Sequence, residues 1–214
     1  VIQGLPLGRT WVQYIVKDAC GNVGECFTEI DVFDTTPPVA VCDEHTVVTL
    51  SNNGWAHVFA YTFDDGSHDN CSDVTFSVRR LTAGCNSNGS TNESTNPFGD
   101  FIQVCCEDVG RDVMVELRVT DAYGNKNSCM VTVTTHDKVP PVITCPPAVT
   151  IDCGADTSAV ALGKPVYSDT PLSTPYFTDN CPNPKMSWRN TGVIDNCGQG
   201  VITRTFTVTD NGGR

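Results

Sequence analysis

In the stretch VMVELRVTDAYGN, residues 113–125, apolar and polar side chains alternate up to an aspartate, and a Gly-Asn pair follows. Val115, Leu117 and Val119 are separated by polar or charged residues, and this period of two is typical of a β-strand with one buried face. The DAYGN segment supplies a glycine, which readily adopts the positive φ of a tight turn. Residues 113–125 therefore predict a strand followed by a hairpin turn.

The same pattern occurs three times along the chain. Besides residues 113–145, it covers WVQYIVKDACGNVGECFTEIDVFDTTPPVAVC (11–42) and ITRTFTVTDNGGR (202–214). Its period of about 90–100 residues is the size of a domain, so we expect successive domains. By the same alternation Val12, Tyr14 and Val16 should be buried in the first repeat. Trp188 is expected in the core of the last repeat.

Pro-Pro pairs mark the expected domain boundaries, because proline lacks an N–H and extends the residue before it. Residues 1–34 are predicted to be the C-terminal strands of a partial domain, and residues 35–137 a complete domain. Residues 138–214 are predicted to form a domain that lacks its last strand. The chain begins at Val1, and we expect it to be a processed chain or a piece of a longer one.

Charge and motifs exclude several functions. The chain has 13 Lys+Arg against 25 Asp+Glu, a net charge of −12, which argues against binding nucleic acid or an anionic membrane surface. No apolar run reaches the roughly 18–20 residues that span a bilayer. The sequence contains no G-x-S-x-G, H-E-x-x-H or phosphate-loop motif, so we expect no enzyme.

Twelve cysteines indicate the compartment. They lack the paired short spacings of zinc knuckles, so the natural interpretation is a disulfide framework in an oxidising environment. We therefore predict a secreted, extracellular or cell-surface protein.

Several motifs occur together in each repeat. D-x-x-P-P-V-x-x-C at residues 34–42 is followed by D-N-C at 69–71, and a strand ends in T-D-x-x-G-N at 120–125. This order resembles hyalin-repeat (HYR-like) modules, above all the Cys-rich versions in large surface proteins of Bacteroidetes-type bacteria. The resemblance implies an all-β fold of tandem immunoglobulin-like antiparallel β-sandwich domains, with an adhesive or structural role.

The sandwich topology indicates how far along the strands of a unit each cysteine lies. The first and last strands of a unit run side by side in one direction, so Cys42 is expected to pair with Cys129. Cys153, at the lower end of the opening segment of its unit, is expected to pair with Cys197, which lies just before the rising strand. The remaining cysteines of the middle unit, Cys71, Cys85, Cys105 and Cys106, allow three pairings, which stay open. Cys20, Cys26, Cys145 and Cys181 are expected to pair outside this segment or between subunits. Two alternatives follow, a longer polypeptide or strand donation by a neighbouring subunit.

Acidic residues gather at one end of each predicted unit, and they favour calcium, which prefers carboxylate and carbonyl oxygen. The candidate calcium ligands are Asp34, Asp65, Asp69, Asp121, Asp137, Asp179 and Asp210. The alternative is that these aspartates cap turns through their own backbone. No cofactor is required under that alternative.

Short modification motifs are also present. Asn70, Asn88 and Asn92 begin N-x-S sequons, and Thr35 lies in a D-T-T sequence similar to an O-glycosylation signal of Bacteroidetes-type bacteria. We expect these four residues to be glycosylated on the surface.

Repetition favours a non-catalytic structural or adhesive module of a surface stalk, fibre or filament, because repeating a unit extends reach and multiplies weak contacts. Its expected partners are neighbouring repeats, identical subunits, glycans or host and substratum surfaces. The alternative function is a carbohydrate- or protein-binding accessory domain of a secreted multidomain protein.

Overall fold

The computed structural model describes residues 4–148, 150–152, 154–159, 161–167, 176–194 and 200–210. The described chain is all-β, with two short 3-10 helices, η1 (Ala60–Phe63) and η2 (Cys106–Asp108). The strands are β1 (Gly8–Lys17), β2 (Val23–Val32), β3 (His45–Thr49), β4 (Trp55–Phe59), β5 (Val74–Arg80), β6 (Phe101–Cys105), β7 (Asp112–Asp121), β8 (Lys126–His136), β9 (Val142–Thr144), β10 (Val166–Tyr167), β11 (Tyr176–Thr178), β12 (Lys185–Ile194) and β13 (Gly200–Thr209). No helix of the described residues is both long and apolar enough to cross a membrane.

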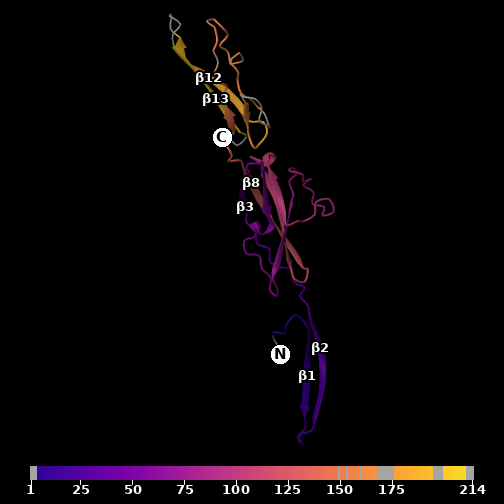
Figure 1. Ribbon diagram of the computed structural model, residues 1–214. Helices are drawn as coiled ribbons and strands as arrows, with labels where there is room; N and C mark the ends of the chain where they lie inside the picture. The colour runs from indigo at the N-terminus through magenta and orange to yellow at the C-terminus, as the bar shows by residue number, and fades with distance from the viewer. Residues whose placement is uncertain are drawn as a thin grey trace.

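The strands form three groups that follow one another along a single long axis (Figure 1). The hairpin β1–β2 occupies one end and the pair β12–β13 the other. Every strand pairing between the described residues lies within residues 1–34, 35–137 or 138–214. The domain limits at residues 34 and 137 remain a prediction, and no strand pairing between the described residues crosses them.

The middle group is a sandwich. One sheet has the strand order β3-β8-β7-β5, and the other consists of β4 and β6. Strand β7 pairs antiparallel with both β8 and β5, whereas β3 runs parallel to β8. Strands β3 and β8 are the first and last strands of this unit, and their parallel pairing is the arrangement from which the Cys42–Cys129 bond was predicted.

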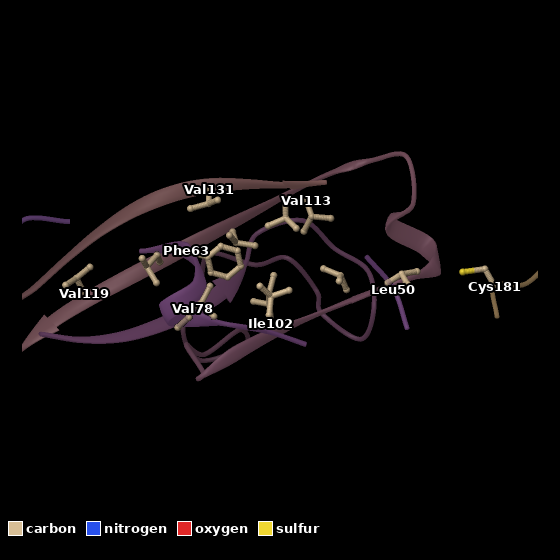
Figure 2. Packing of buried hydrophobic residues seen from close by; sticks show 14 residues of the cluster. Leu50, Phe63, Val78, Ile102, Val113, Val119, Val131 and Cys181 are labelled. Carbon is tan, nitrogen blue, oxygen red and sulfur yellow. The ribbon is translucent and has the colours of Figure 1, made fainter. Parts of the chain in front are cut away.

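The alternation in β7 determines the core. Val115, Leu117 and Val119 are fully buried, while the intervening residues are half-buried on the outer face. Phe63 of η1 packs into the space between the sheets and is also fully buried (Figure 2). These side chains and their neighbours form one cluster, which extends at one end to Cys181 of the following repeat.

The predicted core of the outer repeats is wrong for this structure. Tyr14 and Val16 of β1 are 50% and 70% exposed, and Trp188 of β12 is 46% exposed. The physical reason is that, among the described residues, hairpin β1–β2 has no second sheet of its own, and the sheet β10-β11-β9 in the repeat of β12–β13 has strands of only two or three residues. Alternation therefore marked the strands correctly, but burial needs the second layer.

A buried ion pair holds the long loop between β5 and β6. Arg80 Nη1 donates to Asp108 Oδ2 at 2.8 Å, and both side chains are less than 5% exposed. The Arg80 guanidinium also donates to the carbonyl oxygens of Thr82 and Gln103. The disulfide Cys85–Cys105 closes the same loop.

Candidate functional site

The first acidic cluster lies where the chain enters the middle sandwich. Asp34 follows β2, Asp69 lies in the loop before β5, and Asp121 ends β7. One carboxylate oxygen of each lies within 4.8 Å of the other two. The fold thus brings together three of the seven candidate calcium ligands.

Two of these carboxylates divide their oxygens between two roles. Asp34 Oδ1 accepts a hydrogen bond from the Thr36 N–H at 3.0 Å, whereas Asp34 Oδ2 is buried without a hydrogen-bond partner. Likewise Asp69 Oδ2 accepts from the Cys71 N–H at 3.0 Å, and Asp69 Oδ1 is buried without a partner. One oxygen of each residue therefore caps a turn, and the other is left without a donor.

Asp121 organises the turn at the end of β7. Its Oδ1 accepts from the backbone N–H groups of Tyr123 and Asn125 at 2.8 and 2.9 Å. Gly124 has φ +88°, as expected from the turn sequence. The Asn125 side chain donates to Asp121 Oδ2 at 2.7 Å and to the Asp34 carbonyl at 3.2 Å, which ties the turn to the preceding repeat.

Hydrogen bonds keep Asp69 and Asp121 of the first cluster ionised. The Cys71 N–H is the main cause that lowers the pKa of Asp69. Burial acts to raise the pKa of Asp121, but its hydrogen bonds from Asn125 outweigh burial and the pKa is lowered. Both carboxylates therefore carry negative charge at neutral pH. Desolvation, followed by the charges of Asp34 and Asp69, raises the pKa of the nearby Cys71 thiol.

A second acidic cluster occupies the equivalent place in the next repeat. Asp137 follows β8 directly, Asp179 follows β11, and Asp210 follows β13. Asp137 and Asp210 are only 3% and 6% exposed. Burial raises the pKa of Asp179, and the nearby charges of Asp137 and Asp210 raise it further. Asp137 and Asp210 are thus both close enough to act on Asp179.

Asn180 joins the second cluster. Its Nδ2 donates to Asp137 Oδ1 at 3.1 Å, which also accepts from the Val139 N–H at 3.1 Å. The buried oxygens Asp137 Oδ2, Asp179 Oδ1 and Asn180 Oδ1 have no hydrogen-bond partner. Both junctions therefore contain buried side-chain oxygens that make no hydrogen bond.

Two other sets of potential ligands do not form such a site. Asp65 is exposed and is absent from the cluster that contains Asp34, since its backbone belongs to the loop that pairs with Val41. Cys85, Cys105 and Asp108 also lie within 4.8 Å of one another. Cys85 and Cys105 are joined in a disulfide, and Asp108 forms an ion pair with Arg80. These atoms are therefore not available as metal ligands.

Three disulfides join the described cysteines. Cys42 is bonded to Cys129, the pair expected from their depth on neighbouring strands, with a Cα–Cα distance of 6.1 Å. Of the four cysteines whose pairing was left open, Cys85 and Cys105 are bonded to each other. The expectation that all four pair within the middle unit is wrong, because Cys71 is free and Cys106 is bonded outside that unit. The third bond joins Cys106 to Cys181.

The prediction that Cys71 forms a disulfide within the middle unit is wrong in this structure, where Cys71 is an exposed free thiol. Its neighbour Ser72 accepts a hydrogen bond from the Ala122 N–H, which places the loop against the turn after β7. That turn carries Tyr123 where the first repeat has Cys20, so it offers no sulfur.

The expected pairing of Cys181 outside this segment is also wrong, because Cys181 is bonded to Cys106 of the middle sandwich with a Cα–Cα distance of 5.4 Å. Successive side chains at a strand end point to opposite sides. Cys105 therefore faces Cys85 in its own unit, whereas Cys106 faces the next repeat. The vicinal pair was the signal in the sequence that could have revealed this link.

The second junction is closely packed around this bond. Gly54 has φ +76°, and a Cβ at this position would lie 2.7 Å from the Asn180 carbonyl oxygen and 2.8 Å from Cys106 Sγ. Asn180 Nδ2 also donates to the Ser51 carbonyl at 3.4 Å. Loops of the middle sandwich thus contact the D-N-C loop of the following repeat directly.

The remaining predicted residues lie at the surface or outside the description. Cys20, Cys26 and Cys145 are exposed free thiols, while Cys153 and Cys197 lie outside the described residues. The candidate glycosylation residues Thr35, Asn70, Asn88 and Asn92 are all exposed.

Fold and junctions together define a class, namely disulfide-bonded all-β repeats joined end to end. No family model matches the chain. The chain is 28% identical over 174 residues to hyalin of Strongylocentrotus purpuratus, which covers 79% of this chain and 12% of that protein. It is 26% identical over 216 residues to hyalin of Lytechinus variegatus, covering 96% of this chain and 37% of the relative.

These matches support a hyalin-like domain, and the chain spans well under two thirds of each relative. They lend no support to the expected link with bacterial surface proteins, since both relatives come from the genera Strongylocentrotus and Lytechinus.

Proposed function

We propose that this chain is a non-catalytic, extracellular structural and adhesive repeat module of a stalk, fibre or filament. The observation that carries the proposal is the Cys106–Cys181 bond, which covalently joins two consecutive repeats. The similarity to two hyalins supports the same class of repeat. A disulfide across a junction keeps two neighbouring units together under tension, and a row of repeats presents many copies of a weak contact.

Neighbouring repeats or identical subunits are the proposed partners. The hairpin β1–β2 exposes Trp11 and Phe27 at 59% and 58%, and Phe33, the residue after β2, is 73% exposed. At the other end Val193 and Val201 are 80% and 75% exposed. Burial of such apolar surface favours association, and strand addition would complete these two-stranded sheets.

Force spectroscopy on the whole chain, pulled from both ends, tests the load-bearing role. The loops closed by Cys42–Cys129 and Cys106–Cys181 overlap. A bond between Cys153 and Cys197, expected from the sequence, would bypass this stretch of chain, so both residues are replaced by serine in every variant. In this C153S/C197S background, replacing Cys106 and Cys181 by serine frees about 30 residues, or about 100 Å of extended chain at roughly 3.5 Å per residue.

The expected result is an increase of about 100 Å in unfolded contour length for C106S/C181S, at about 3.5 Å per freed residue. A matched control, C20S/C26S, removes two exposed thiols and should leave the contour length unchanged. Equal contour lengths for the C153S/C197S background with and without C106S/C181S would contradict the disulfide across the junction. Strong, selective binding of glycans by one isolated unit would instead favour the accessory-domain alternative.

A further inference from the structure

We propose that each junction between repeats binds a calcium ion that is shared by the two repeats it joins. The ion at the first junction is held by Asp34, Asp69 and Asp121, and the ion at the second by Asp137, Asp179 and Asp210 with Asn180. This proposal concerns the metal alone and stands independently of the proposed mechanical role.

The ligands of the first ion come from both sides of the junction. Asp34 lies two residues after β2, the last strand of the first repeat, whereas Asp69 and Asp121 belong to the middle sandwich. The Asn125 side chain already holds the Asp34 carbonyl against the turn after β7. An ion bound here therefore fastens the end of one repeat to the loops of the next.

Bare, buried oxygens show that this cluster lacks a positive partner. Asp34 is 92% buried, and its Oδ2 has no hydrogen-bond partner, as is true of Asp69 Oδ1. The five arginine–carboxylate ion pairs of the described residues involve none of the three aspartates of this cluster. Burying charged oxygens without a partner is costly, and a cation among them removes that cost.

Recurrence at the second junction is independent support. Asp137 takes the place of Asp34 directly after the last strand of its repeat, is 97% buried and also has a bare Oδ2. Asp179 and Asn180 each contribute another buried oxygen without a partner. Turn capping alone does not explain why a bare oxygen remains at the same place in both repeats.

The donor set suits calcium, which accepts an irregular shell of six to eight oxygens. At the first junction, oxygens that lie within 4.8 Å of one another can all contact one ion at the calcium–oxygen distance of about 2.3–2.6 Å. Magnesium requires about 2.0–2.1 Å and near-ideal octahedral geometry. Carboxylate and carboxamide oxygens are the ligands of a hard cation, and water or backbone carbonyls complete a calcium shell.

The two junctions differ in what else holds them. Cys106–Cys181 locks the second junction covalently, whereas the first has no disulfide among the described residues. Removal of calcium should therefore loosen the first junction more than the second.

The test is calorimetric titration of the EDTA-treated whole chain with calcium chloride, followed by magnesium chloride on a fresh sample. We expect two calcium ions per chain. Asp34→Asn and Asp137→Asn should each weaken one site more than about tenfold, because a charged ligand is lost while the oxygen that caps the turn is kept. Asp65→Asn is the matched control and should retain both sites, since Asp65 lies outside the cluster.

Asp69→Asn provides a second variant at the first junction, and small-angle scattering gives a second readout. The maximum dimension should increase and become better defined on adding calcium to the wild type, and D34N and D69N should abolish most of this change. No saturable binding, equal loss of binding in D65N and D34N, or tighter binding of magnesium than of calcium would each overturn the proposal.

Discussion

Replacing Cys42 and Cys129 by alanine opens the longest of the three disulfide loops in the described part of the chain. Their sequence separation is 87 residues, compared with 20 for Cys85 and Cys105. Loop-closure entropy assigns about 4.6 kcal/mol to the first bond and about 3.3 kcal/mol to the second. We therefore expect C42A/C129A to lower the free energy of unfolding of the middle sandwich by about 1.3 kcal/mol more than C85A/C105A.

Urea denaturation at a fixed calcium concentration measures the difference. Trp55 of β4 reports on the middle sandwich when Trp11 and Trp188 are replaced by phenylalanine. Cys85 and Cys105 are 6% and 5% exposed, so C85A/C105A also loses buried sulfur. This loss adds to the cost of C85A/C105A and makes the expected difference between the two variants smaller. An equal or larger loss for C85A/C105A would refute the reasoning that loop length dominates.

Three further substitutions test the core, the buried ion pair and the second junction. Leu117→Ala removes a fully buried side chain from β7 and should cost about 2–5 kcal/mol in the free energy of unfolding, measured by urea and Trp55 fluorescence. Arg80→Met leaves Asp108 buried without its partner and should cost about 3–5 kcal/mol, whereas R80M combined with D108L should recover much of it in a double-mutant cycle. Asp179→Asn should raise the melting temperature in EDTA at pH 7. The pKa of Asp179 is raised in the fold above its ordinary value of 3.8, so the ionised carboxylate destabilises the metal-free fold. This destabilisation develops as the pH rises from 3.8 through the raised pKa, and it is complete at pH 7.

Each of these expectations has an opposing outcome. A loss below 1 kcal/mol, far under the usual cost of about 2–5 kcal/mol, would show that the Leu117 site collapses around the cavity. Additive losses in the Arg80 and Asp108 cycle would show that the two charges are not coupled. For Asp179→Asn, a lower melting temperature at pH 7 in EDTA, or the same increase below the ordinary carboxyl pKa, would contradict the sign of its pKa shift.

Local patterns were sufficient to locate strands and turns. The alternation around Leu117 predicted strand β7, and Gly124 predicted the turn after it. Each prediction needs only residues that are neighbours in the chain. The depth of Cys42 and Cys129 followed from the same strand register. Burial of Tyr14 and Trp188 could not be derived in this way, because it depends on whether a second sheet covers them.

Residue types and spacing alone predicted a cysteine-rich all-β repeat with acidic turns, because alternation and turn chemistry act over a few neighbouring residues. Only the folded chain decided that Cys106 reaches Cys181, and that Asp34, Asp69 and Asp121 meet while Asp65 remains apart. These contacts join loops separated by tens of residues, and their distances depend on how one sandwich abuts the next. The oxygens that cap turns can be anticipated from sequence, whereas the bare ones are revealed only when the repeats are packed together.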